Sequence, residues 1–181
     1  ASTGLDALTH AVEAYIGRST TKKTRKAALK AVQLIFANLQ TAYHDGNNMT
    51  ARKNMLHASY YAGVAFTISY VGYVHAVAHS LGGRYNIPHG LANAVLLPIV
   101  LRGYGSTIYK KLHELADAAG LSDASESDAS AAEKFISAIE NMLDEFSLGR
   151  TLAGIKAEDI PELARHADAE GNPLYPVPVL M

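Results

Sequence analysis

Three histidines lie within fifteen residues of an apolar stretch near the middle of the chain. His75 and His79 are four residues apart, so on a helix their side chains share one face. His89 follows ten residues later, directly after Pro88. Burying imidazole rings among apolar side chains is costly unless the rings have partners. A metal ion is one such partner, so the three histidines are a candidate metal site.

A second candidate cluster lies near the start of the chain, where Asp6 and His10 are also four residues apart. Taken alone, this pair also fits an acid at a helix start and a core histidine with a satisfied ring. With both clusters counted together, an ordinary polar network of core histidines explains the pattern less well than a metal does. Histidine and aspartate ligands without thiolates suit Fe(II), Zn, Co or Ni. By spacing alone, His75 and His79 are the expected ligand pair of their helix.

Composition limits the other kinds of protein that the chain could be. Its 181 residues suit one domain with a real core better than two full domains. The absence of cysteine excludes disulfides, thiolate metal sites and cysteine nucleophiles. A formal net charge of −1 gives no sign of nucleic acid or an anionic membrane as the main partner. No apolar run reaches the roughly 18 to 20 residues that span a bilayer, so a cytoplasmic location is the default.

The elements that must position the two clusters are helices. Apolar periodicity and turn signals predict helices over 5–16, 21–44, 50–69, 71–81, 89–100, 107–119, 131–146 and 158–167. Ser2 or Thr3 is the expected cap of the first helix, and Gly82-Gly83 is the expected end of the fourth. Strand alternation is scarce, and the sequence has no glycine-rich phosphate loop. We therefore predict an all-α fold in which 1–181 form a single helical domain.

Two long segments resemble a known family. Residues 4–15 are similar to the first metal segment of the iron-containing (group III) alcohol dehydrogenases, and residues 72–94 are similar to that family's second signature. The segment Ala62-Gly63-Val64-Ala65-Phe66 also matches. The resemblance covers most of the chain and weakens after position 105. It implies the helical metal-binding half of the dehydroquinate synthase-like superfold.

The resemblance also implies roles for single residues. The family's metal ligands fall on Asp6, His10, His75 and His89. Its non-ligand histidine, which lies beside the nicotinamide and the substrate and has a suggested part in proton transfer, falls on His79. Phe66 falls on a position that lines the substrate and nicotinamide pocket. The resemblance therefore overrules the spacing argument for His79 as a ligand.

The implied parent enzyme interconverts a primary alcohol and an aldehyde by hydride transfer with NAD or NADP. Fe(II) is the expected metal, with zinc as a possibility. The N-terminal α/β nucleotide-binding domain and a final helix are expected to lie outside this chain, which has no initiator methionine and reads as a piece of a longer protein. We expect the piece alone to be inactive and the full-length enzyme to be a homo-oligomer.

Departures from the family pattern keep two alternatives open. The pair after Phe66 is Thr67-Ile68, where many members have polar or small residues, and Leu174 follows Asn172-Pro173, where many have arginine. One alternative is a related zinc enzyme, such as a glycerol-type polyol dehydrogenase or a dehydroquinate synthase. The other is a non-enzymatic helical module whose histidines only pack.

Overall fold

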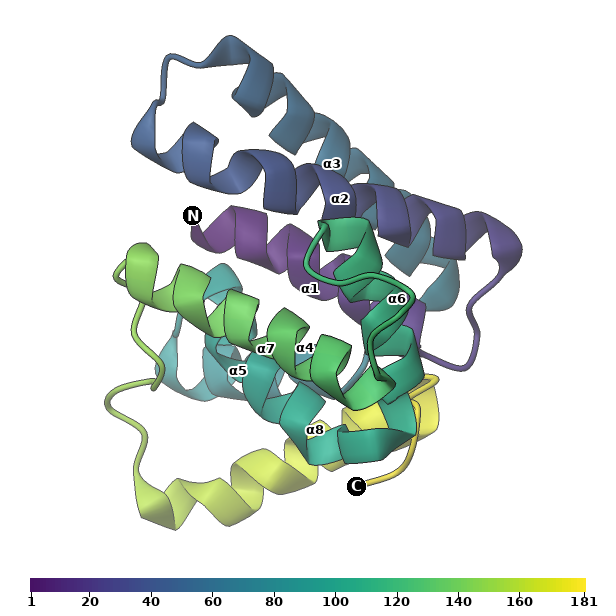
Figure 1. The fold of residues 1–181 in the computed structure, drawn as a ribbon. Helices are drawn as coiled ribbons and strands as arrows, with labels where there is room; N and C mark the ends of the chain where they lie inside the picture. Colours follow the sequence, from purple (N-terminus) through teal and green to yellow (C-terminus); the bar gives the residue numbers. More distant parts are fainter.

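The computed structural model describes residues 1–181 and contains only helices and their connections (Figure 1). The helices are α1 (Ser2–Ile16), α2 (Lys22–His44), α3 (Met49–Ser69), α4 (Tyr73–Tyr85), α5 (His89–Tyr104), the 3-10 turn η1 (Gly105–Ile108), α6 (Tyr109–Ala119), α7 (Asp128–Glu145), the 3-10 turn η2 (Ala157–Asp159) and α8 (Ile160–Leu174). The all-α prediction is confirmed.

Helix α1 is the centre of the fold. It lies between the hairpin of α2 and α3 on one side and α5 and α6 on the other, while α8 covers α4 (Figure 1). Because neighbours surround it, α1 is apolar on nearly every face, and Leu5, Leu8, Ala11 and Val12 are fully buried. These side chains belong to one continuous core of 38 buried residues, so α1 connects the two sides of the bundle.

The boundaries of α2 follow the local signals in the sequence. Thr21 and Thr24 form a capping box at its start, each side chain accepting a hydrogen bond from the other residue's backbone N–H. The helix ends at His44, as the range 21–44 predicts, directly before the turn residues Asp45-Gly46. Asn48 caps α3 with a single hydrogen bond, which its side chain accepts from the Ala51 N–H. The α2–α3 hairpin, which packs against α1, is therefore predictable from its capping and turn residues.

Two predicted boundaries are wrong. Gly82 and Gly83 lie inside α4, which continues to Tyr85 and ends where Asn86 adopts a left-handed conformation with φ 54°. Asparagine tolerates this conformation, and its N–H bonds the Gly82 carbonyl, so Asn86 terminates the helix. Helix α1 has Ala1 rather than Ser2 or Thr3 at its N-cap, without a side-chain hydrogen bond.

Two other helices are longer than the sequence pattern predicts. Helix α5 runs past Val100 to Tyr104 with Pro98 inside it, and α8 extends to Leu174 with Pro173 in its last turn. Tertiary packing overrides the local proline signal at Pro98, which is buried. By length and composition the segment His89–Ala119 is a candidate membrane span. However, buried core helices meet the same test, and 56% of its most apolar window is buried in the bundle.

Candidate metal centre

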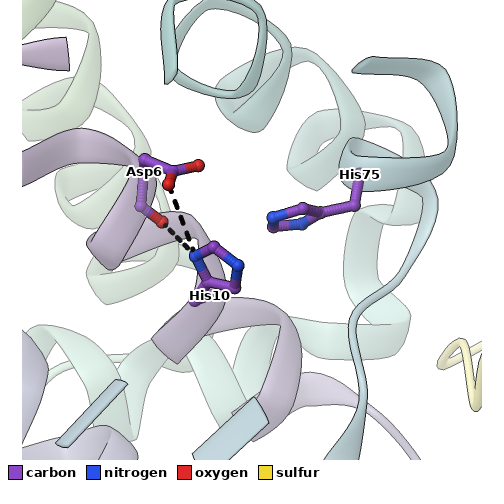
Figure 2. Close-up of side chains that lie close together, drawn as sticks. All are labelled: Asp6, His10 and His75. Carbon is purple, nitrogen blue, oxygen red and sulfur yellow. Dashed lines mark hydrogen bonds and ion pairs between the residues drawn. The ribbon is translucent and has the colours of Figure 1, made fainter. Parts of the chain in front are cut away.

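Side chains from α1, α4 and α5 converge on one group of polar residues. Figure 2 shows Asp6 and His10 on α1 facing His75 on α4. Potential ligand atoms of these three residues all lie within 4.8 Å of one another. His89, the first residue of α5, brings its Nε2 to 3.3 Å from the Asp6 Oδ1. The four predicted metal ligands therefore come together, with His89 at the exposed edge of the group.

A close approach of two helix starts delivers His89 to this group. A Cβ atom on Gly90 would lie 2.9 Å from the carbonyl oxygen of Ser2 and 3.1 Å from its carbonyl carbon. Only glycine allows the backbone of α5 to lie this near the first turn of α1. Gly90 thus allows His89 to lie close to Asp6.

Hydrogen bonds at Nδ1 determine that Nε2 is the nitrogen of His10 and of His75 that could bind a metal. The Nδ1–H of His10 donates to the backbone carbonyl oxygen of Asp6 at 2.9 Å, and the Nδ1–H of His75 donates to the Glu13 carboxylate at 2.6 Å. In both neutral rings the Nε2 atom then carries the lone pair. A carboxylate or carbonyl behind a ligand histidine is the usual arrangement at metal centres.

The environment also favours the neutral form of two rings. Burial lowers the pKa of His10 below the usual 6.5, and the neighbouring His75 lowers it further. Burial likewise lowers the pKa of His89, although Asp6 acts in the opposite direction. A metal binds neutral imidazole, so both shifts favour metal binding.

Asn93 is a central member of the group that the sequence argument missed. Its Nδ2 lies 2.6 Å from the Asp6 Oδ1, 3.1 Å from the His75 Nε2 and 3.0 Å from the His89 Nε2. Three atoms that can accept a hydrogen bond therefore face one NH₂ group that has only two hydrogens. The Oδ1 of Asn93 is buried without a partner. Acceptors that converge in this way, from one carboxylate and several imidazoles, fit a divalent cation.

Glu13 was also missed, although a signal for it exists. It is a carboxylate in an otherwise apolar run, seven residues after Asp6 and on the same side of the helix. Its side chain is only 2% exposed, and it accepts from both Val74 N–H and His75. A buried acid at helical spacing from two candidate ligands is itself a sign of a supporting residue.

His79 and Phe66 lie beside the group rather than in it. The His79 Nδ1–H donates to Glu170 at 2.6 Å, and its ring stacks on His89 with centroids 5.4 Å apart. The ring of Phe66 lies 4.2 Å from that of His10. Both residues line a cleft of about 410 Å³ together with His10, Thr67, Tyr70, Val71, His75, His89 and Tyr175. Five of the six residues predicted for the site line this cleft. The sixth, Asp6, lies next to His10 and His89.

Tyr70 lines the same cleft in an unusual backbone conformation. It follows the last residue of α3 and has φ 62° and ψ −172°, a combination that favours glycine. The preceding residue, Ser69, is held by hydrogen bonds to Ser19 and Thr24. This anchor allows the chain to turn sharply from α3 towards His75 on α4.

Comparison with known proteins agrees with this architecture. The family described as "Fe-containing alcohol dehydrogenase family, C-terminal" matches residues 1–178. The chain therefore belongs to the iron-containing alcohol dehydrogenases and corresponds to their C-terminal helical region.

Particular relatives share a large part of the sequence. The chain is 45% identical over 174 residues to 1,3-propanediol dehydrogenase of Klebsiella pneumoniae, covering 95% of this chain and 45% of that protein. It is 43% identical over 171 residues to alcohol dehydrogenase 4 of Saccharomyces cerevisiae, covering 92% and 43%. The chain thus spans less than half the length of these relatives.

Solved structures show the same fold. A crystal structure of 1,3-propanediol oxidoreductase superposes with a TM-score of 0.94 at 43% identity, over 100% of this chain and 48% of that one. A sulfoacetaldehyde reductase from Bifidobacterium kashiwanohense in complex with NAD+ superposes with a TM-score of 0.84 at 27% identity, over 98% and 45%.

Proposed function

We propose that the chain is the metal-binding part of an NAD(P)-dependent alcohol dehydrogenase that interconverts a primary alcohol and an aldehyde. Asp6, His10, His75 and His89 are the proposed ligands of Fe(II), with zinc as the alternative metal. The observation that carries the proposal is the convergence of acceptor atoms from Asp6, His75 and His89 on a single point. Family membership supports the reaction class.

The ligand set determines the charge of the centre. A divalent ion held there acts as a Lewis acid that lowers the pKa of an alcohol hydroxyl group. The four ligands contribute a single negative charge through Asp6. The centre therefore keeps a net positive charge, which favours the anionic form of an alcohol in the adjacent cleft.

The two residues beside the centre have separate roles in the proposal. His79 uses Nδ1 to donate to Glu170, so its Nε2 is free to exchange a proton with a hydroxyl group in the cleft. The His79 side chain is 42% exposed, which gives the proton a route to water. Phe66 packs against His10 and gives the cleft an apolar wall.

The remaining components of the reaction lie outside these residues in our proposal. NAD or NADP accepts the hydride, held mainly by an N-terminal nucleotide-binding domain of the same parent chain. An NAD+ complex of a structural neighbour supports this choice. We further propose that the whole enzyme is a cytoplasmic homo-oligomer and that these 181 residues alone turn over alcohols slowly or not at all.

Metal titration of single-residue variants tests the ligand assignment. We expect His89→Ala to weaken Zn(II) or anaerobic Fe(II) binding by more than the roughly 10- to 100-fold typical of an outer-shell change. His89 is a suitable target because its side chain is 45% exposed, so the variant should fold. His44→Ala is the matched control, since His44 is an exposed histidine paired with Glu145. Equal metal affinity in His89→Ala and the unmodified chain would show that the assignment is wrong.

A further inference from the structure

We propose that Glu13 is a positioning residue of the metal centre, whose carboxylate holds the proton of the His75 ring on Nδ1 and so presents the bare Nε2 to the ion. This inference rests on the proposed function in that it takes His75 as a ligand. It assigns a role to a buried acid that does not itself touch the converging ligand atoms.

Glu13 connects two helices through both of its carboxylate oxygens. Its Oε1 accepts the backbone N–H of Val74 at 2.8 Å, and its Oε2 accepts the Nδ1–H of His75 at 2.6 Å. The side chains of Glu13 and His75 are each 2% exposed, so water does not compete for these bonds. Val74 is in the first turn of α4, where backbone N–H groups have no partner within the helix. The same carboxylate therefore anchors the start of α4 and orients its ligand.

The hydrogen bond from Val74 determines which tautomer of His75 can bond to residue 13. A backbone N–H is always a donor, so the Val74 N–H requires an acceptor on Glu13. A carboxylate can accept from two donors at once, and the ring of His75 then keeps its hydrogen on Nδ1. A glutamine at this position has only one accepting oxygen. If that oxygen bonds Val74, the amide NH₂ group faces the Nδ1 of His75, which must then accept and carry its hydrogen on Nε2.

A second contact agrees with a bare Nε2 on His75. This atom lies 3.1 Å from the Nδ2 of Asn93, and an amide NH₂ group can only donate. The ring thus donates on the side of Glu13 and accepts on the side of the ligand group. The two contacts come from different helices, α1 and α5, and they require the same tautomer.

Space for this arrangement is provided by a glycine. A Cβ atom on Gly72 would lie 2.9 Å from the Glu13 Oε1 and 3.4 Å from its carboxyl carbon. Any larger side chain at this position would displace the carboxylate from Val74. Gly72 is the N-cap of α4, so the residue that starts the helix also makes room for the acid that holds it.

The test compares Glu13→Gln with the unmodified 181-residue chain by two measurements. The first is the tautomer of His75 in metal-free protein, from ¹⁵N chemical shifts of the imidazole, assigned by their absence in His75→Ala. The second is Zn(II) affinity, from titration against a competing chelator. We expect the hydrogen to move from Nδ1 to Nε2 and the affinity to fall about 10- to 100-fold, as for other residues that orient a ligand histidine. Glu145→Gln is the matched control, because Glu145 accepts from His44 at 2.7 Å on the surface.

The possible outcomes separate this inference from the proposed function. If Glu13→Gln keeps the hydrogen on Nδ1 and binds Zn(II) as tightly as the unmodified chain, the inference is wrong, while the metal site stands. If the unmodified chain binds no metal, the proposed function fails, and the tautomer measurement still decides whether Glu13 controls the ring. If Glu13→Gln does not fold by circular dichroism, Gly72→Ala replaces it. Weaker Zn(II) binding by a folded Gly72→Ala supports the inference, and unchanged binding overturns it.

Discussion

The Nδ2 of Asn93 lies 2.6 Å from the Oδ1 of Asp6, which joins α5 to α1 at the point that the His75 and His89 rings also face. Asn93 is fully buried, and its amide group supplies hydrogen to acceptors that would otherwise face one another. Lone pairs that converge without a donor destabilise a metal-free protein. Asn93 therefore compensates these acceptors in the metal-free protein, as a cation would in the proposed site.

Asn93→Ala is expected to destabilise the metal-free chain more than the metal-loaded chain. Removing the amide leaves a carboxylate oxygen of the half-buried Asp6 without this donor, which costs about 1 kcal/mol of unfolding free energy. Saturating Zn(II) should reduce that loss, because the ion replaces the amide as the partner. Urea unfolding with and without Zn(II) measures both values. Asn54→Ala is the control, since Asn54 donates to Asn38 between α2 and α3, and its effect should not depend on metal.

Gly90→Ala is expected to destabilise the protein and weaken metal binding together. The added Cβ would meet the backbone of Ser2 at 2.9 Å, and backbone atoms cannot move aside as a flexible side chain can. The start of α5 must then shift away from α1, at a cost of about 1–3 kcal/mol, and His89 moves away from Asp6. Thermal melting and Zn(II) titration measure the two effects.

Gly83→Ala provides the matched control for that change. Gly83 lies inside α4, and a Cβ there would have no atom within 4 Å. Replacing a helical glycine whose conformation suits alanine stabilises a protein by about 0.4–1 kcal/mol. A similar loss of stability in both variants would contradict the role assigned to the Gly90 contact.

Arg102→Lys is expected to reduce stability by less than about 1 kcal/mol, and in a salt-dependent manner. Arg102 near the end of α5 forms two hydrogen bonds to Glu133, at 2.8 and 2.9 Å, and two to Glu140, at 3.0 and 3.2 Å; both glutamates are on α7. Lysine keeps the positive charge but lacks the planar guanidinium group, whose several N–H groups bond both carboxylates. The side chain is 42% exposed, so high salt should remove most of the difference in urea unfolding. Arg52→Lys, at an arginine of α3 without an ion pair, should change nothing.

His113 is expected to titrate above the usual 6.5. The hydrogen bond from its Nδ1–H to Asp128 raises the pKa most, and the bond from its Nε2–H to the Asp123 carbonyl oxygen adds to this. With both nitrogens donating, the ring is protonated. Its contribution to stability is then complete below pH 6.5 and is lost as pH rises through the raised pKa.

NMR titration of His113 checks this expectation, with Asp128→Asn as the comparison. The amide removes the charged acceptor, so the pKa of His113 should move back towards 6.5. Unfolding free energies of the unmodified chain and His113→Gln should converge at alkaline pH. A pKa that does not respond to Asp128→Asn would show that the Asp128 bond is absent in solution.

The helices of this fold could be predicted where the signal is local. Thr21 and the Asp45-Gly46 pair mark α2 correctly because capping and turn chemistry act within a few residues. Gly82 and Gly83 misled the prediction because a glycine pair weakens a helix without necessarily ending it. The helix continues where α4 packs against α5 and α8, and the stop comes from Asn86.

The candidate site was predictable only in part, for a related reason. Spacing treats His75 and His79 alike, since they share one helix face. Their environments differ through Glu13 and Glu170, which lie 62 and 91 residues away along the chain. Asn93 was hidden in the same way, because its partner Asp6 is 87 residues distant. The family resemblance predicts ligand positions, but the supporting residues Glu13 and Asn93 required the three-dimensional arrangement.

The wide separation of these partners has a consequence for the order of folding. Helices form from local contacts within microseconds, whereas α1 must wait for α4 and α5 before the ligand group exists. In a refolding experiment, high-affinity metal uptake should therefore follow the appearance of helical circular dichroism rather than accompany it. A metal ion bound at the proposed centre would stabilise the native chain by mass action, and this stabilisation would grow with the logarithm of the free metal concentration. The ion would therefore stabilise the finished bundle rather than start its folding.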